Sequence, residues 1–363
     1  MEGIGVKILF DGIIYEIQKA GGISKYWCKL TNYFSLDDNV EVVSIQGINA
    51  EANIFFPKKI KNKIYNQDWL PLKIRRYLPV FNTYNCEIFH SSYYRVPFFK
   101  SKHTKQIVTV HDFMYEFFDT GLKKKVHIWQ KRKAMLNADA IICVSEHTKQ
   151  DLIKLYPEVK REILYVVPNG VDEEFKVLAK SNEKKDFLLF VGNRMGCKNF
   201  KFILKFMTES KFIQDKQFYV KCVGGGKFNK HEFDLFKEFG VAGKIKQVLS
   251  IENEELNVLY NQAYALLFPS KYEGFGIPAL EAQMAGCPVV YAKTSSLPEV
   301  MGYDELGYTL DDLTEADQKL QLLEDDIFRK NIIVKGVNFV SKLTWENSAK
   351  LTYKVYKKAL NNE

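Results

Sequence analysis

Residues 268–291 have the sequence FPSKYEGFGIPALEAQMAGCPVVY, and their pattern decides the fold. An apolar run ends at Phe268 and a glycine-rich loop follows. Pro278 then suits the first turn of a helix, because its missing N–H costs nothing there. Residues 285–288 end that helix, and a second apolar run begins at Val289. A strand, a helix and a second strand in this order predict a parallel sheet with helices packed against it.

The loop and the helix of this segment suit a polar, anionic ligand. Gly274 and Gly276 let backbone N–H groups approach an anion closely, and the N-terminus of the following helix favours a phosphate or a sugar hydroxyl. Glu281 falls about one turn into the helix, where a carboxylate can accept two hydrogen bonds from a vicinal diol such as a ribose. The alternative for Glu281 is an exposed carboxylate that only interacts with the helix dipole.

The two glutamates at 273 and 281 flank GFGIPAL, and this arrangement resembles the signature of retaining glycosyltransferases of sequence family 4, which have the GT-B fold. The following PVV and SSLPEV extend the resemblance. The resemblance implies that Glu281 holds the ribose of a nucleotide. It also implies that Glu273, with the backbone amides of Phe275, Gly276 and Ile277, holds the hydroxyls of a donor sugar.

Residues 190–199, FVGNRMGCKN, resemble the loop after the first strand of that family's C-terminal domain. The resemblance implies that Gly192, Arg194 and Lys198 lie at the diphosphate of the donor. Two cations there would stabilise the charge that grows on a departing nucleoside diphosphate. The chain has no Asp-x-Asp, so we expect no metal bridge and no cofactor besides the nucleotide sugar. The alternative is two surface cations. Three glycines at 224–226 are a weak signal, because a plain loop explains them equally well.

The N-terminal half has three further pieces that resemble the family. Gly21 and Gly22 follow the first strand, where the family has a glycine loop near the donor phosphate and the acceptor; a turn before a helix is the alternative. In the segment VTVHD, residues 108–112, His111 lies at the carboxyl end of the expected strand, and the resemblance implies that a histidine so placed contacts the donor sugar. His90 is a weaker candidate, for which a core role is the alternative. Ser145 begins a helix in a motif that is mostly structural.

The fold class predicted is α/β, with two Rossmann-like domains facing each other across a cleft and a C-terminal helix crossing back to the N-terminal domain. A chain of 363 residues exceeds what one core usually organises. We expect an acceptor-binding domain at 1–170, a nucleotide-sugar-binding domain at 171–343 and the helix at 344–363. Strands are expected at 6–10, 40–44, 88–90, 106–111, 140–144 and 164–166, and then at 187–191, 219–223, 246–248, 265–268 and 289–291.

Charge is distributed unevenly along the chain. Residues 1–170 have 25 Lys and Arg against 17 Asp and Glu, whereas the remainder has 27 of each. A basic N-terminal half predicts an anionic partner, such as a phospholipid surface or a lipid-linked phosphate. Residues 57–78 interleave basic and aromatic side chains, which suits a membrane surface; a solvated loop and helix is the equal alternative. The six scattered cysteines predict buried, reduced thiols.

These features together predict a retaining, metal-independent hexosyltransferase that uses a UDP- or GDP-sugar. We expect a saccharide acceptor, either free or linked to a lipid diphosphate, and a role in cell-surface polysaccharide assembly (O-antigen, capsule or lipopolysaccharide). No segment is apolar enough to span a bilayer, so a cytoplasmic protein peripheral to the inner face of the membrane is expected. The alternatives are a nucleotide-sugar hydrolase or epimerase on the same fold, or a non-catalytic binding partner. No nucleic-acid motif is present.

Overall fold

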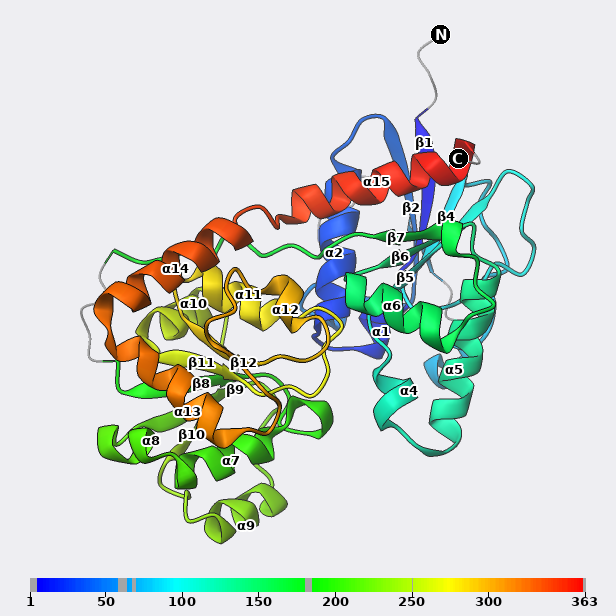
Figure 1. The fold of residues 1–363 in the computed structure, drawn as a ribbon. Coiled ribbons are helices and arrows are strands. Elements are labelled where there is room, and N and C mark those ends of the chain that lie inside the picture. Colours follow the sequence, from blue (N-terminus) through cyan, green and yellow to red (C-terminus); the bar gives the residue numbers. More distant parts are fainter. Residues whose placement is uncertain (1–4, 58–63, 67–69, 180–184, 250, 362–363) are drawn as a thin grey trace. The chain divides into compact units, whose positions relative to one another are not determined.

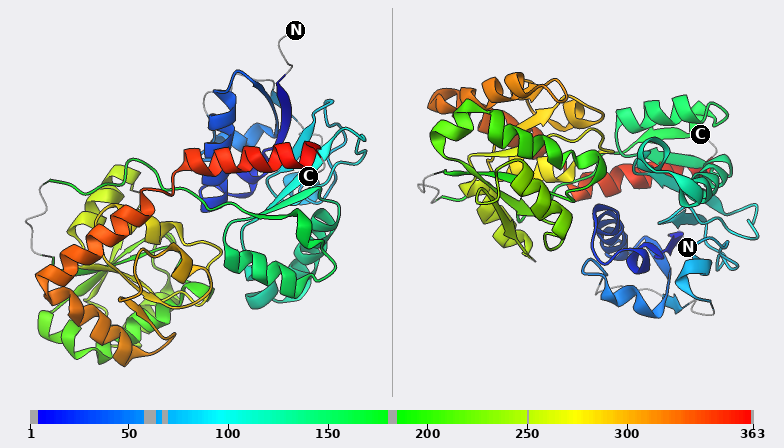
Figure 2. Two further views of the ribbon diagram at one scale, coloured as in Figure 1. Left: turned by 45° about the horizontal axis from the view of Figure 1, so that its top comes forward. Right: turned by 90° about the horizontal axis from the view of Figure 1, so that it is seen from below.

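The computed structural model describes residues 5–57, 64–66, 70–179, 185–249 and 251–361. The chain divides into two compact units, the first made of Met1–Asn169 with Trp345–Glu363 and the second of Gly170–Thr344 (Figure 1). The division between Asn169 and Gly170 lies one residue from the boundary expected after residue 170. Each unit has one parallel sheet of its own and helices on both faces of that sheet (Figure 2).

The first unit has a seven-stranded sheet in the order β3-β2-β1-β4-β5-β6-β7. Its strands are β1 (Val6–Asp11), β2 (Val40–Gln46), β3 (Ile64–Asn66), β4 (Ile88–Ser91), β5 (Lys105–Val110), β6 (Ala140–Cys143) and β7 (Leu164–Val166). Its helices are α1 (Ile14–Ile17), α2 (Gly22–Ser35), α3 (Leu72–Arg75), α4 (Met114–Phe118), α5 (Gly121–Leu136), α6 (Glu146–Leu155) and α15 (Trp345–Asn361), with short 3-10 turns at Ile48–Ala52 (η1) and Arg161–Ile163 (η2). The strand order reverses between β1 and β4, which creates a crevice at the carboxyl ends of these two strands.

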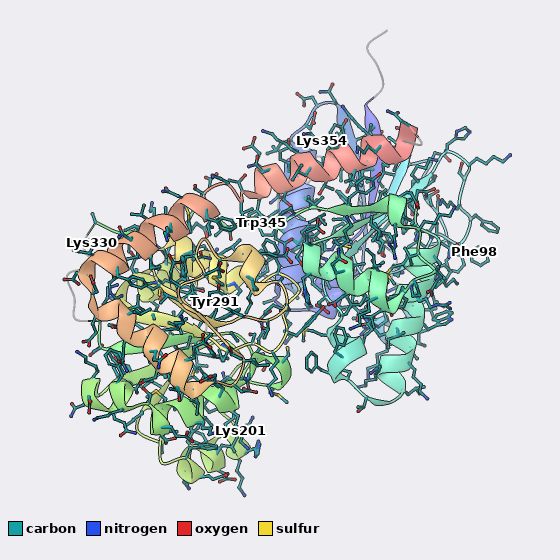
Figure 3. The ribbon with its side chains drawn as sticks, viewed as in Figure 1. Phe98, Lys201, Tyr291, Lys330, Trp345 and Lys354 are labelled. Atoms are coloured by element: carbon teal, nitrogen blue, oxygen red, sulfur yellow. The ribbon has the colours of Figure 1, made fainter. Side chains whose placement is uncertain are left out.

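The C-terminal helix α15 packs against α2 and the sheet of the first unit (Figure 1). Tyr356 is fully buried there and stacks on Phe34, with ring centroids 5.6 Å apart. Trp345 lies at the beginning of α15 (Figure 3). Its ring contacts that of Tyr26 of α2 edge-on, with ring centroids 6.3 Å apart. The expected return of the final helix to the N-terminal part of the chain is confirmed.

The second unit has a six-stranded sheet in the order β10-β9-β8-β11-β12-β13. Its strands are β8 (Phe187–Val191), β9 (Tyr219–Val223), β10 (Ile245–Val248), β11 (Ala265–Phe268), β12 (Val289–Ala292) and β13 (Gly307–Tyr308). Its helices are α7 (Phe200–Glu209), α8 (Lys211–Lys216), α9 (Lys230–Glu238), α10 (Asn253–Gln262), α11 (Ile277–Met284), α12 (Leu297–Val300), α13 (Leu313–Gln321) and α14 (Asp326–Val340), with 3-10 turns at Gly196–Lys198 (η3) and Leu322–Glu324 (η4). The switch point lies between β8 and β11, so the loops after these two strands share one ligand-binding edge.

The strands expected from the sequence are confirmed within two residues at their ends, and β3 and β13 were missed. The central strands are buried along their whole length, because helices cover both faces of a parallel sheet. Two residues are too few for β13 to show a pattern. None of the six cysteines, all of which lie in the described ranges, forms a disulfide bond, and all except Cys28 are buried.

The basic segment at 57–78 lies partly outside the described residues, including Lys58, Lys59, Lys61, Lys63 and Trp69. Of the remainder, Arg75 faces inward and is buried, so it is unavailable to a membrane surface. Arg76 lies over the ring of Tyr93 at 4.8 Å. Within the described ranges, no helix has the length and apolar character needed to cross a bilayer.

Candidate functional site

The loop between β11 and α11 places the candidate site of the second unit at the carboxyl edge of its sheet. Strand β11 ends at Phe268, and α11 begins at Ile277 with Pro278 in its first turn. Gly276 precedes the helix with a φ of +101°, a conformation that favours glycine. A Cβ at Gly276 would also approach Leu297 to 3.0 Å. The backbone conformation therefore favours glycine at 276, and a side chain there would also have to displace the end of the Leu297 side chain slightly.

Hydrogen bonds from Ser296, the residue before α12, hold this loop in one orientation. Ser296 Oγ donates to the carbonyl oxygens of Glu273, at 3.0 Å, and of Phe275, at 3.1 Å. Among the described residues, none accepts a hydrogen bond from the backbone N–H groups of Phe275, Gly276 or Ile277. The loop thus turns its carbonyls inward and leaves three N–H donors at the N-terminus of α11, which is an anion-binding arrangement.

Lys198 and Glu273 are brought together from the loops after β8 and β11. Lys198 Nζ lies 2.6 Å from Glu273 Oε1, and the same oxygen accepts a hydrogen bond from Ser270 Oγ at 2.6 Å. The backbone N–H of Glu273 donates to Ser295 Oγ at 2.8 Å. The side chain of Lys198 is only 20% exposed and that of Glu273 only 9%. Gly192, with a φ of +139°, lies beside the Lys198 side chain. The expected cation and carboxylate therefore share one partly buried position at the switch point.

Arg194 lies in a different network from Lys198. Its Nε donates to Glu232 of α9 at 2.6 Å, and its Nη atoms donate to the carbonyls of Gly225, at 3.2 Å, and Gly226, at 2.9 Å, and to that of Gly224. Burial raises the pKa of Glu232 and the Arg194 hydrogen bond lowers it, with a net shift downward. The guanidinium therefore anchors the glycine loop after β9.

The glycine loop at 224–226 is a feature that the sequence analysis set aside. All three glycines have a positive φ, which is +87° at Gly224, +72° at Gly225 and +71° at Gly226. A Cβ at Gly225 would meet Arg194 Nη1 at 2.7 Å. Three consecutive glycines after a strand were the available signal, because side chains rarely adopt this backbone conformation.

Glu281 is buried in the second turn of α11, with 5% exposure. The Tyr260 hydroxyl donates to its Oε2 at 3.4 Å. The alternative of an exposed helix carboxylate is therefore wrong. A buried carboxylate is costly unless it is hydrogen-bonded, so this position favours a ligand-binding or structural role over a solvated one.

His111 lies in the first unit, directly after β5. Its Nε2 is buried and has no hydrogen-bond partner among the described residues. Burial lowers the pKa of His111 to about 4; Asp112 opposes this shift and Lys131 adds to it. The imidazole is consequently neutral at neutral pH, with an unused ring nitrogen that a ligand hydroxyl could engage.

The remaining candidates of the first unit have local roles. His90 bonds Tyr356 Oη at 2.7 Å and Thr109 Oγ1 at 2.9 Å, which identifies it as a satisfied core histidine. Gly22 begins α2, and the carbonyl of Gly21 accepts from Ser24 Oγ at 2.9 Å. Ser145 caps α6, as its motif predicted. The glycine pair therefore lies at a helix N-terminus after the first strand.

Comparisons with known proteins agree with this fold. Sucrose-phosphate synthase of Thermosynechococcus elongatus superposes with a TM-score of 0.75 at 17% identity, over 99% of this chain and 100% of that one. Anabaena HepE, solved in complex with UDP and glucose, superposes with a TM-score of 0.70 at 14% identity, over 97% and 99% of the chains. The fold is that of the GT-B glycosyltransferases.

Sequence comparison gives the family. The profile of "Glycosyl transferases group 1" matches residues 171–338, and that of "Glycosyltransferase Family 4" matches residues 20–175. The chain therefore belongs to the group 1, or family 4, glycosyltransferases, and the resemblance stated from the sequence is confirmed.

Several relatives are named as glycosyltransferases, and two of them as O-antigen chain mannosyltransferases. An uncharacterized glycosyltransferase of Methanocaldococcus jannaschii is 29% identical over 61% of this chain and 60% of that protein. O-antigen chain mannosyltransferase B of Escherichia coli is 25% identical over 78% and 77%. O-antigen chain mannosyltransferase RfbU of Salmonella typhimurium is 25% identical over 77% and 74%.

Proposed function

We propose that this glycosyltransferase moves a hexose from a UDP- or GDP-sugar to a hydroxyl of a saccharide acceptor, with retention of the anomeric configuration. The observation that carries the proposal is the Lys198–Glu273 pair beside the three unpartnered N–H groups that begin α11. A fixed cation and convergent N–H donors suit a diphosphate and the hydroxyls of its sugar.

The proposed binding site of the nucleotide-sugar donor lies in the second unit. Lys198 stabilises the negative charge that grows on the diphosphate as the glycosidic bond breaks. Glu273 and the amides of Phe275, Gly276 and Ile277 hold the sugar hydroxyls, and Glu281 holds the ribose. The binding of UDP by the structurally similar HepE supports a nucleotide donor. Arg194 contributes by holding the glycine loop at the same edge.

Transfer proceeds by attack of the acceptor hydroxyl on the face from which the diphosphate leaves. The bond from the anomeric carbon to the phosphate oxygen breaks, the bond to the acceptor oxygen forms, and a diphosphate oxygen takes the acceptor's proton. The transition state resembles an oxocarbenium ion. His111 Nε2 contributes a hydrogen bond to the donor sugar. The positive charge of Lys198 takes the place of a metal ion, so EDTA leaves the rate unchanged.

The proposed acceptor is a saccharide intermediate in the assembly of a cell-surface polysaccharide such as O-antigen, capsule or lipopolysaccharide. The O-antigen mannosyltransferases among the relatives support this assignment. The excess of Lys and Arg in residues 1–170 supports a lipid-diphosphate-linked acceptor at the inner face of the cell membrane.

Calorimetric titration with UDP, GDP and ADP tests the donor site. One nucleotide is expected to bind the parent protein and to bind Glu281→Gln roughly tenfold more weakly, because one or more charge-assisted hydrogen bonds are lost. Nuclear magnetic resonance of the glycoside product then gives its anomeric configuration. An inverted product would overturn retention, and nucleotide release at the same rate without acceptor would indicate a hydrolase.

A further inference from the structure

A buried cation lies beside the loop that carries His111 in the first unit. Lys131 belongs to α5 and is only 1% exposed, although its side chain is charged. Moving an ammonium group out of water is costly unless the group is paired and hydrogen-bonded. The proposed transfer does not use this lysine as a ligand, so its burial must serve the structure around it.

Three oxygen atoms surround the ammonium group of Lys131. Its Nζ donates to the backbone carbonyl of Asp112 at 2.7 Å, and to Glu116 Oε1 at 3.0 Å and Oε2 at 3.1 Å. The rings of Phe113 and Tyr94 lie 4.3 Å and 5.5 Å from the same nitrogen and add cation–π contacts. An ammonium group has three N–H donors, so none is left for a ligand. Lys131 therefore acts on its neighbours in the fold.

Glu116 connects this cation to the helices around it. It belongs to α4, and its side chain is only 6% exposed. Its Oε1 also accepts a hydrogen bond from the hydroxyl of Tyr156, the residue after α6, at 2.9 Å. Its backbone carbonyl accepts one from Lys124 Nζ of α5 at 2.8 Å. One buried ion pair thus joins α4, α5 and the end of α6.

The backbone around His111 is held on both sides. After the histidine, Lys131 binds the carbonyl of Asp112. Before it, Thr109 Oγ1 is hydrogen-bonded to the hydroxyl of Tyr26 at 3.1 Å, and the ring of Tyr26 meets that of His111 edge-on, with centroids 5.0 Å apart. The Asp112 carbonyl belongs to the next residue along the chain, so releasing it would change the direction of the imidazole.

We propose that Lys131 is a positioning residue for His111, because it holds the backbone directly after this histidine and thereby fixes the direction of Nε2. The inference rests on the proposed function, in which His111 contacts the donor sugar, and deepens it by naming the residue that orients this contact. The Lys131 charge also adds to burial in lowering the pKa of His111, whereas Asp112 raises it. The same cation thus helps to keep the imidazole neutral.

Calorimetric titration of the full chain tests the positioning role. The titrants are UDP-glucose, UDP-galactose, UDP-N-acetylglucosamine and GDP-mannose, each compared with UDP or GDP alone, so that the difference isolates the sugar contact. Lys131→Met combined with Glu116→Gln removes both buried charges together. Glu116→Gln alone keeps the contact of Lys131 with the Asp112 carbonyl, although it leaves a buried charge unpaired and is the less stable variant.

A neighbouring ion pair on the same helix provides the matched control. Arg132 Nε of α5 lies 2.7 Å from Glu158 Oε1, and the side chains of Arg132 and Glu158 are 54% and 35% exposed. Arg132→Met combined with Glu158→Gln therefore makes the same chemical change between α5 and the segment after α6. It leaves the loop that carries His111 untouched.

One nucleotide sugar is expected to bind the parent, the control and Glu116→Gln equally. It should bind both His111→Asn and the Lys131→Met/Glu116→Gln variant about fivefold more weakly, the effect of losing one hydrogen bond. The bare nucleotide should bind all of these proteins equally. Adding His111→Asn to the Lys131→Met/Glu116→Gln variant should cause no further loss, because Lys131 acts only through His111.

Three results would overturn the positioning role of Lys131. They are additive losses, an equal loss in Glu116→Gln, and unchanged binding of the nucleotide sugar by the Lys131→Met/Glu116→Gln variant. Unchanged binding by His111→Asn would refute the contact of His111 with the donor sugar, and the inference with it. A parent protein that binds none of the nucleotides or nucleotide sugars would refute the proposed function itself.

Discussion

Replacing Arg194 by lysine separates two roles for this residue. If Arg194 bound the diphosphate directly, a lysine would retain its charge, and the stability of the second unit would hardly change. The structure predicts the opposite, because a lysine ammonium cannot span Glu232 and the carbonyls of Gly224, Gly225 and Gly226 together. We expect the glycine loop to lose its anchor and the second unit to become less stable.

The magnitude follows from the contacts of the guanidinium. Arg194 donates to Glu232 at 2.6 Å and to the carbonyls of Gly225 and Gly226 at 3.2 and 2.9 Å. A hydrogen bond from a charged donor contributes about 1.5–3 kcal/mol, and a lysine can keep the contact with Glu232. Losing at least two of the three backbone contacts, each at the lower end of that range, predicts a destabilisation of about 3 kcal/mol. For a unit of this size, that corresponds to a fall in Tm of roughly 6–12 °C.

Thermal unfolding and nucleotide titration of Arg194→Lys form the assay. Lys205→Met is the matched control, because Lys205 is 54% exposed in α7 and its loss removes a charge without breaking a buried network. Arg194→Met, Glu232→Gln and the double variant complete a cycle that measures the coupling of the pair. An unchanged Tm for Arg194→Lys together with tenfold weaker nucleotide binding would refute the anchoring role and favour a direct contact with the diphosphate.

Three further outcomes are expected. Lys198→Ala should lower kcat at saturating donor by about 10²–10³, measured by product formation, since a cation that acts on the leaving group is strongest in the transition state; a change confined to KM would contradict this. Between pH 7 and pH 5, the free energy of unfolding of the parent should fall by about 2 kcal/mol more than that of His111→Asn, as measured by urea unfolding. The reason is that folding lowers the pKa of His111 from 6.5 to about 4. Between these two pH values the unfolded chain binds a proton at this histidine and the folded chain does not. The stability present above pH 6.5 is therefore lost as the pH falls toward 4. Binding to liposomes with anionic lipid should occur at low salt and disappear at high salt, as sedimentation would show, because the basic charge of residues 1–170 is screened; binding that is insensitive to salt would contradict an electrostatic attachment.

The sheets and the ends of their strands were predictable because they depend on local patterns. Apolar runs of four to six residues mark the buried strands. The position of the loops after the strands then follows, because parallel strands bring their carboxyl ends to one edge of the sheet. For this reason Lys198 and Glu273, 75 residues apart in the chain, could be expected at one position before their 2.6 Å contact was known. The motifs that carried the prediction are short and contiguous.

The partners of individual side chains were not predictable in the same way. Arg194 and Lys198 lie four residues apart, yet Arg194 anchors the glycine loop and Lys198 contacts Glu273. Lys198 belongs to the 3-10 turn η3 and Arg194 precedes it, and no local pattern in the sequence reports this difference. Glu16 of α1 and Arg75 of α3 are a similar case, because their buried ion pair depends on how the segments after β1 and β3 fold, and β2 separates these two strands in the sheet. A basic segment thus appeared to be a surface feature, although Arg75 is buried. The sequence locates the edge of a sheet where chemistry occurs, whereas the assignment of a charge to ligand or scaffold depends on packing that only the fold supplies.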